Sequence, residues 1–204
     1  MPDQKPRVWA KDQKPGVWSK DQKPGVWVIS GPSGVGKGTV CAKLREQRPD
    51  VLYSVSMTTR DPRPGEVDGV SYHFVSPEHF DDLASRGLLL EHAVVHGTHS
   101  YGTPRPPVDR ALADGRPVVL EIDMQGARQV KRNMPEAQLV FLSPPSWEEL
   151  TRRLIGRGTE DEPALKRRLQ TARTELAGSH KADHCIVNDV VEDTVATLIG
   201  LMRL

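Results

Sequence analysis

The sequence contains very little cysteine: Cys41 and Cys185 are the only two among 204 residues. Two isolated thiols provide neither a disulfide framework nor the paired CxxC motif of a structural metal site. This pattern is typical of proteins in a reducing compartment, so the sequence predicts a cytoplasmic protein.

Long apolar runs are also missing. No stretch of 18 apolar residues occurs, which argues against a transmembrane helix, and the polar N-terminus lacks the apolar core of a secretory signal. The formal net charge is only +1, which argues against non-specific binding of nucleic acid. The composition, 37% hydrophobic and 27% charged, predicts one ordinary globular core with no membrane or nucleic-acid partner.

A nine-residue repeat occupies residues 3–29, with the units DQKPRVWAK, DQKPGVWSK and DQKPGVWVI. A unit this short, with a proline and mostly a glycine, cannot hold a helix or a long strand. We expect residues 1–20 to form a disordered extension. The alternative is an arm of tryptophans and lysines that touches a partner or a nucleotide. The third unit differs because it continues directly into an apolar strand.

After the repeats, apolar strands alternate with helical patterns. This rhythm predicts an α/β fold with a parallel core sheet flanked by helices. Residues 51–95 interrupt it with short β-like pieces, and Asp68-Gly69 marks a hairpin turn there, so we expect a small inserted β-rich subdomain. Ser146 and Glu149 form a capping box at a helix start. The expected strands are 26–30, 117–122, 138–142 and 184–187, and the expected helices beyond the first are 108–113, 124–133, 146–154, 164–177 and 190–204.

The stretch GPSGVGKGT at residues 31–39 follows a strand and opens a helix, as a phosphate-binding loop does. Glycines let backbone N–H groups turn toward a phosphate, the helix N-terminus adds positive potential, and Lys37 can reach the β- and γ-phosphates. Gly38 stands where the strict pattern has a hydroxyl, and Thr39 follows it. The loop by itself predicts a bound nucleoside triphosphate and leaves a GTPase, an ATPase motor and a small-molecule kinase open.

A second stretch, residues 54–74, combines two arginines, several hydroxyls and a tyrosine in a turn-rich region. Arg60 and Arg63 can hold a phosphate in bidentate geometry, and Tyr72 can add a neutral donor. The alternative is that these arginines are surface residues paired with Asp61 or Glu66. His92, His96 and His99 lie close in sequence, but no fourth ligand is evident, so we expect no metal site there.

Several motifs in one order resemble the guanylate kinase family of bacterial type, from about Val26 to the C-terminus. They are GPSGVGKGT, SVSMTTRDPRPGEVDGVSYHF, LLLEHAVVHG, YGTPR, LEIDMQGARQV, LVFLSPPSWEEL, RLIGRGTEDE, RRLQTARTEL and IVND. The segment between Gly97 and Gly102 is one residue longer than the family's form. The resemblance implies a P-loop nucleoside monophosphate kinase fold at 21–204, with a core (24–52, 97–150 and 171–204), a GMP-binding subdomain (53–96) and a mobile lid (151–170).

The resemblance also implies roles for individual residues. For GMP these are Ser56, Thr103 and Glu91 at the guanine, Arg60, Arg63, Tyr72 and Tyr101 at the phosphate, and Glu121 at the guanosine. For ATP they are Gly31, Pro32, Ser33, Gly34, Val35, Gly36, Lys37, Gly38, Thr39 and, near the adenine, Asn188. Catalysis would fall to Lys37, Arg153, Arg157, Arg168 and Asp123, with Mg²⁺ held through Thr39 and Asp123, partly through water.

The implied activity is in-line transfer of a phosphoryl group from ATP to GMP, giving ADP and GDP, in purine nucleotide metabolism and GMP recycling, with dGMP as a further acceptor. Two rival hypotheses remain at this stage. One is a binding module without activity, which would usually lack the intact loop around Lys37. The other is a P-loop kinase for a different phosphorylated acceptor, such as a sugar phosphate, which should lack the set Ser56, Glu91 and Thr103.

Overall fold

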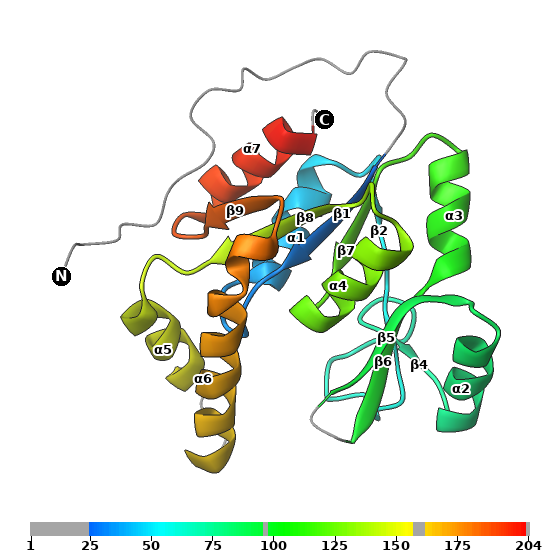
Figure 1. The fold of residues 1–204 in the computed structure, drawn as a ribbon, viewed down its shortest axis with the longest axis horizontal. Helices are drawn as coiled ribbons and strands as arrows, with labels where there is room; N and C mark the ends of the chain where they lie inside the picture. The colour runs from blue at the N-terminus through cyan, green and yellow to red at the C-terminus, as the bar shows by residue number, and fades with distance from the viewer. Residues whose placement is uncertain (1–24, 96–97, 157–161, 203–204) are drawn as a thin grey trace. The chain divides into compact units, whose positions relative to one another are not determined.

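A computed structural model of the chain describes residues 25–95, 98–156 and 162–202 (Figure 1). These residues fall into two compact units. One unit consists of residues 31–46 and those from 140 onward, and the other of residues up to 30 together with 47–139. In both units parallel strands alternate with helices, which confirms the expected α/β class.

The second unit contains a ladder of three parallel strands. β7 (Val118–Glu121) lies between β1 (Val26–Ser30) and β2 (Leu52–Tyr53), with Val118 opposite both Val26 and Leu52. Every residue of β1 is buried, as its continuous apolar run predicts. The last residues of the third repeat unit thus form the start of a core strand.

A separate four-stranded sheet in this unit has the order β4 (His73–Phe74), β3 (Met57–Thr58), β6 (His99–Pro104) and β5 (Leu89–Val95). β6 runs antiparallel to both β3 and β5, whereas β4 runs parallel to β3. The expected hairpin at Asp68-Gly69 is therefore wrong: the chain turns there, but its only strand pairing is an isolated bridge between Asp68 and Tyr72. The reason is that β4 pairs in parallel with β3, the strand before it, across the whole segment 59–72, rather than antiparallel with residues 66–67 across a tight turn.

Three helices accompany these strands: α2 (Pro77–Ser85), α3 (Arg105–Ala113) and α4 (Met124–Asn133). Helix α4 lies along β5 (Figure 1) and donates side-chain hydrogen bonds to it. Gln129 Nε2 is 2.6 Å from the carbonyl oxygen of His92, and Asn133 Nδ2 is 2.9 Å from that of Leu90. These bonds, from the middle and the last residue of the helix, fix α4 relative to the small sheet, which matters for the site described below.

The first unit contains α1 (Lys37–Gln47), the strands β8 (Gln138–Ser143) and β9 (His184–Val187), the 3₁₀ turn η1 (Ser179–Lys181) and α7 (Val191–Met202). β8 and β9 are parallel, with Val140 opposite His184. Phe141 and Leu142 of β8 are fully buried, as are Val195 and Leu198 of α7.

Two further helices of this unit, α5 (Trp147–Ile155) and α6 (Glu162–Ala177), lie side by side (Figure 1). Leu150, Leu154 and Ala172 form a buried cluster between them. Trp147 packs against this cluster and carries the guanidinium of Arg173 4.9 Å from its ring centre. Together these helices contain most of the described residues of the expected lid (151–170), and they extend beyond it at both ends.

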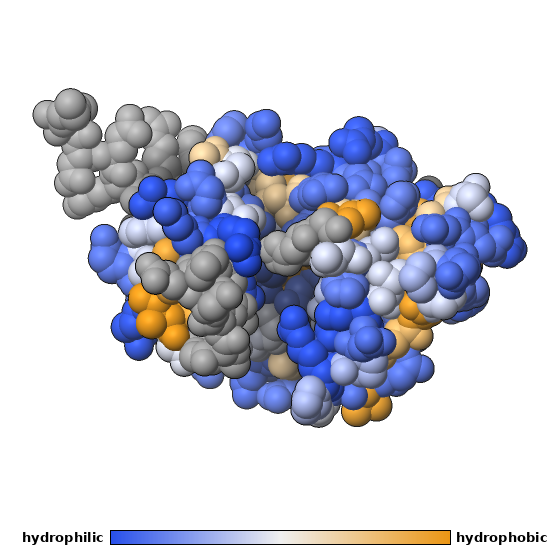
Figure 2. All heavy atoms as spheres, turned by 90° about the horizontal axis from the view of Figure 1, so that it is seen from below, coloured by the Kyte–Doolittle hydropathy of each residue, from blue (hydrophilic) through white to orange (hydrophobic). Residues whose placement is uncertain are grey.

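The surface shows no broad hydrophobic area on the face drawn in Figure 2. Its described residues are mostly hydrophilic, with hydrophobic residues in small separate groups. None of the helices within 25–95, 98–156 and 162–202 is both long enough and apolar enough to cross a membrane. Most of the repeat segment, including residues 1–20, lies outside the described residues.

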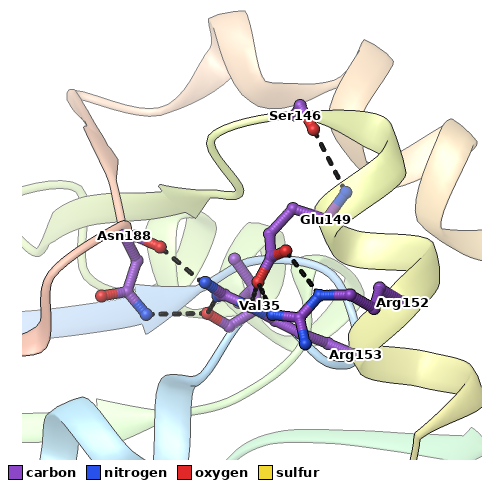
Figure 3. A network of polar contacts seen from close by, with 6 residues as sticks. All are labelled: Val35, Ser146, Glu149, Arg152, Arg153 and Asn188. Atoms are coloured by element: carbon purple, nitrogen blue, oxygen red, sulfur yellow. Dashed lines mark hydrogen bonds and ion pairs between the residues drawn. The ribbon is translucent and has the colours of Figure 1, made fainter.

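Ser146 is confirmed as the N-cap of α5, because its hydroxyl oxygen accepts a hydrogen bond of 3.1 Å from the N–H of Glu149 (Figure 3). The reciprocal half of the expected capping box is not formed, since the Glu149 carboxylate binds Arg152 and Arg153 instead of the Ser146 N–H. We expect Ser146→Ala to lower the free energy of unfolding by about 1 kcal/mol, since an N–H of the first turn loses its partner. Urea titration monitored by circular dichroism measures this loss. Ser146→Asn, which preserves a capping oxygen, should restore most of it, and equal stability of the alanine and asparagine variants would contradict the assignment.

Candidate functional site

The phosphate loop is closed by the side chain of Lys37, the first residue of α1. Its ammonium donates hydrogen bonds of 2.6 Å to the carbonyl oxygen of Gly31 and 3.2 Å to that of Pro32. Within the loop the N–H of Val35 donates to the Pro32 carbonyl at 3.2 Å. A positive charge is therefore held directly against the glycine-rich turn, as phosphate binding requires. Gly38 and Thr39 are exposed in the first turn of α1.

Asn188 contacts this loop through its side chain. Its Nδ2 donates a hydrogen bond of 2.7 Å to the carbonyl oxygen of Val35, and its Oδ1 accepts one of 2.9 Å from the Thr194 hydroxyl. Asn188 is only 2% exposed. Gly36 has φ +99°, and a Cβ at this position would approach Asn188 Nδ2 to 2.6 Å. The turn therefore needs glycine for its backbone angle and for the closeness of Asn188.

Arg153 reaches the same place from α5 (Figure 3). Its Nη1 lies 3.4 Å from the carbonyl oxygens of Val35 and Asn188, and its Nε donates to Glu149 Oε1 at 2.7 Å. Arg152 also binds Glu149, with Nη2 2.7 Å from Oε1. Hydrogen bonds from Arg152 and Arg153 lower the pKa of the Glu149 carboxyl to about 2. Arg153 thus lies beside the loop, in contact with a carboxylate.

Two other arginines were expected near ATP. Arg168 lies on α6 and is partly exposed. Arg157 lies outside the described residues, so the structure gives it no position.

The residues expected at guanine form a row on the small sheet, with Glu91 on β5, Thr103 on β6 and Ser56 directly before β3. Glu91 of β5 is directly opposite Thr103 of β6. The register of β3 with β6 pairs Met57 with Gly102, so Ser56, one residue earlier, comes next to Thr103. Residues directly opposite each other in a sheet share a face. Thr103 and Glu91 are therefore opposite each other, although the segment between Gly97 and Gly102 is one residue longer than the family's form.

Glu91 is a buried carboxyl group, with 5% of its surface exposed. The Thr103 hydroxyl, itself fully buried, donates a 2.7 Å hydrogen bond to Glu91 Oε1. Burial raises the pKa of Glu91 to about 7, the negative charge of Asp123 adds to the effect, and the bond from Thr103 opposes it. The backbone of α4 approaches closely, since a Cβ on Gly126 would lie 2.5 Å from Glu91 Oε2.

Arg60 is the centre of a second cluster in this unit. Its Nη2 is 2.9 Å from both carboxylate oxygens of Glu66, and its Nε donates to the Tyr101 hydroxyl at 3.2 Å. The guanidinium carbon is 5.6 Å from the ring centre of Tyr72, and burial raises the pKa of that tyrosine. Arg60, Tyr72 and Tyr101 are thus brought together as expected. Arg63 is exposed and contacts Glu66 through its backbone, with its N–H donating to the carboxylate and its carbonyl accepting from the Glu66 N–H.

The two acidic residues after β7 differ in their surroundings. Glu121, the last residue of the strand, is exposed. Asp123 is the N-cap of α4, and its Oδ1 accepts a 2.8 Å hydrogen bond from the N–H of Gly126. Asp123 therefore already has a structural role, which leaves its second oxygen for other contacts. Among the residues that the structure describes, no group of three or more histidines, cysteines or acids could hold a metal ion.

Two contributors were missed by the sequence reasoning. Glu149 was identified only as part of a capping box, although its spacing of three and four residues from Arg152 and Arg153 is a recognisable ion-pair signal on a helix. Thr194 carries no local signal, because its relation to the loop depends on Asn188 being folded against Val35.

The raised pKa of Glu91 predicts a pH-dependent stability. The carboxyl has an ordinary pKa of 4.5 when unfolded and about 7 when folded, so its protonated form stabilises the protein below about pH 4.5. That contribution, at most about 3 kcal/mol, is lost as the pH rises through 7. The Glu91→Gln variant cannot titrate at this position. The free energy of unfolding of the wild type, measured relative to that of this variant, should therefore fall between about pH 5 and 8. Urea titrations at several pH values test this. Glu136→Gln, at an exposed position, serves as the control, and a pH-independent difference for Glu91→Gln would contradict the prediction.

Comparisons with known proteins agree with this arrangement. The family model described as guanylate kinase matches residues 23–203. The guanylate kinase of Leifsonia xyli subsp. xyli is 59% identical over 175 residues, which cover 86% of this chain and 69% of that protein. The guanylate kinase of Cutibacterium acnes is 55% identical over 87% of this chain and 89% of its own. The crystal structure of guanylate kinase from Anaplasma phagocytophilum superposes with a TM-score of 0.73 at 35% identity, covering 89% of this chain and 86% of that one. The chain therefore belongs to the guanylate kinase family, and it is an enzyme of the nucleoside monophosphate kinase class.

Proposed function

We propose that the small sheet of this guanylate kinase binds GMP and that the phosphate loop binds ATP, the donor of the transferred phosphoryl group. The observation that carries the proposal is the buried Glu91 carboxyl in its row with Thr103 and Ser56. A carboxyl group removed from water needs hydrogen-bond donors, and guanine offers two on one edge, N1–H and the 2-amino group.

This edge explains the choice of base. Adenine has no hydrogen at N1 and no 2-amino group, so an adenine in the same place would offer the Glu91 carboxylate no donor from the base. Ser56, next along the row, has a hydroxyl that can donate to guanine O6. The Thr103 hydroxyl donates to Glu91 Oε1 without ligand and would have to exchange this partner for guanine O6. The pKa of Glu91 is about 7. Hydrogen bonds donated by the base to this carboxyl group would stabilise its ionised form and so favour loss of its proton.

The GMP phosphate is assigned to the cluster around Arg60. Arg60 presents a planar guanidinium, and Tyr101 and Tyr72 lie beside it. Glu66 occupies one edge of the guanidinium, at 2.9 Å, and fixes its orientation. A phosphate would compete with Glu66 for Arg60, with Arg63 as a second cation from the exposed turn. Glu121 is assigned to the guanosine.

ATP is assigned to the loop at residues 31–39. Backbone N–H groups of the loop would bind the phosphates, and the ammonium of Lys37 would exchange its carbonyl partners for phosphate oxygens. Arg153, Arg157 and Arg168 would neutralise the charge that spreads over the transferred group. The acceptor is already a phosphate oxygen, so no general base is needed.

Mg²⁺ would enter as an ion carried by ATP. The protein oxygens assigned to it, the Thr39 hydroxyl and the Asp123 carboxylate, are the hard ligands that Mg²⁺ prefers, and this ion usually keeps several waters and takes only one or two protein ligands. When bound, it supplies charge neutralisation at the phosphates. Asp123 remains the N-cap of α4 through Oδ1, which fixes the direction of the carboxylate.

The domain assignments are part of the proposal. Residues 53–96 are assigned to GMP binding, and β6, which follows them, contributes Tyr101 and Thr103. Residues 151–170 are assigned to a lid, residues 1–20 to an extension outside the enzyme core.

The proposal predicts nucleotide selectivity. In a coupled assay of ADP release with ATP and Mg²⁺, GMP should be phosphorylated and AMP, CMP and UMP should not. Glu91→Gln should lower kcat/KM for GMP by about 100-fold, because the guanine N1–H and amino group lose a charged acceptor, while the KM for ATP stays unchanged. ADP release with all four nucleotides, or unchanged GMP kinetics in the variant, would refute the assignment of Glu91.

Lys37 provides the corresponding test for the loop. Lys37→Ala should lower kcat by about 100-fold or more, since a preorganised charge at the transferred phosphate is lost. Lys43→Ala is the matched control, because Lys43 lies on the same helix and its ammonium pairs with Glu46 at 3.0 Å on the exposed side. Steady-state kinetics of both variants decide the matter: equal activities would show that Lys37 does not act on the nucleotide.

A further inference from the structure

The peptide between Val35 and Gly36 is held from outside the phosphate loop. Its carbonyl oxygen accepts a 2.7 Å hydrogen bond from Asn188 Nδ2 (Figure 3). A trans peptide is planar, with its C=O and N–H pointing in opposite directions. Fixing the Val35 carbonyl therefore also aims the N–H of Gly36 away from Asn188, and N–H groups of this loop are the ones that bind phosphate.

Asn188 is in turn held by its own contacts. Thr194 of α7 is 2% exposed, and its hydroxyl lies 2.9 Å from Asn188 Oδ1. The backbone N–H of Asn188 donates to the Ser143 carbonyl of β8 at 2.8 Å. With Nδ2 on Val35 and Oδ1 on Thr194, both ends of the amide are engaged inside the protein. A flipped amide would direct Oδ1 at the Val35 carbonyl, which is repulsive.

We propose that Asn188 and Thr194 are positioning residues, which set the phosphate loop for the triphosphate rather than contact the adenine. The inference rests on the proposed binding of ATP at the loop. It differs from the role that the family resemblance implies for Asn188, because the amide is occupied and acts through the Val35–Gly36 peptide.

Arg153 strengthens the argument. It reaches the same Val35 carbonyl, but at 3.4 Å, a weaker contact than that of Asn188. If Arg153 exchanged this contact for a phosphate, as the proposed function assigns, the shorter bond from Asn188 would still hold the carbonyl. The loop thus keeps its shape while the arginine changes partners.

The test compares two threonines of α7. Thr194→Val removes the hydroxyl that binds Asn188, whereas Thr197→Val removes one that bonds only to the carbonyl of Asp193, at 2.8 Å. The single hydroxyl proton of Thr194 is shared between Asn188 Oδ1, at 2.9 Å, and the carbonyl of Val190 four residues earlier, at 3.1 Å, so both variants also lose a helix contact of the same kind. Thr194→Ser retains the hydroxyl and should behave as wild type.

Binding is measured by calorimetry without GMP, using Mg·ATP and, as a probe without a base, inorganic tripolyphosphate with Mg²⁺. Thr194→Val should weaken both ligands to the same extent, about tenfold, with Thr197→Val unchanged. Steady-state kinetics should show a raised KM for ATP and an unchanged KM for GMP. The binding of Mg·ATP and tripolyphosphate does not depend on which acceptor the enzyme uses. If the proposed phosphorylation of GMP were wrong, the activity assay of the wild type would show this separately.

Asn188→Asp gives a second test through pH. An ionised aspartate would face the Val35 carbonyl with an acceptor, so tripolyphosphate should bind more weakly than to wild type at pH 8. The deficit relative to wild type should shrink as the pH falls and the carboxyl becomes a donor. A loss confined to ATP in either variant would identify an adenine contact and overturn the inference. Unaltered binding of both ligands to Thr194→Val would also overturn the inference, as would equal losses of affinity in Thr194→Val and Thr197→Val.

Discussion

The burial of one carboxyl group, Glu91, constrains the architecture of the GMP side. A group that would ionise in water is kept where its pKa is about 7, and the surrounding elements have to make this tolerable. Thr103 supplies a hydrogen bond from the adjacent strand. Helix α4 approaches through Gly126, and the hydrogen bonds of Gln129 and Asn133 to β5 keep the helix in that place. The small sheet and α4 thus form one structure around an acidic group.

The phosphate loop solves a different problem, because its ligands would be negatively charged and its donors belong to the backbone. Backbone donors are aimed by fixing the carbonyl at the other end of each peptide. Lys37 binds two carbonyl oxygens of the loop and Asn188 a third. Glu149 holds Arg153 beside the loop. The same few carbonyl oxygens therefore determine both the loop's shape and the resting place of its cations.

Much of the core could be predicted from the sequence because its signals are local. The apolar runs at 26–30 and 184–187 and the pattern of α4 gave their observed bounds. The small sheet was harder, since β3 and β4 have only two residues each and exist through pairing with distant partners. Helix α2 was missed within a region expected to be β-like, although Ser76 and Pro77 are ordinary helix-start residues. Contacts such as that of Asn188 with Val35, 153 residues apart, leave no trace in any local pattern.

The start of β1 inside the third repeat unit has a consequence for variation in the chain. The last unit supplies Val26, Trp27, Val28 and Ile29 to the core, four of the five residues of the strand. Removing either earlier unit as a whole, or inserting another copy, shifts the numbering by nine residues and leaves the sequence of this strand unaltered. Slippage in the coding sequence of the repeats, in steps of one unit, thus changes the length of the N-terminal segment without rewriting the first strand of the enzyme.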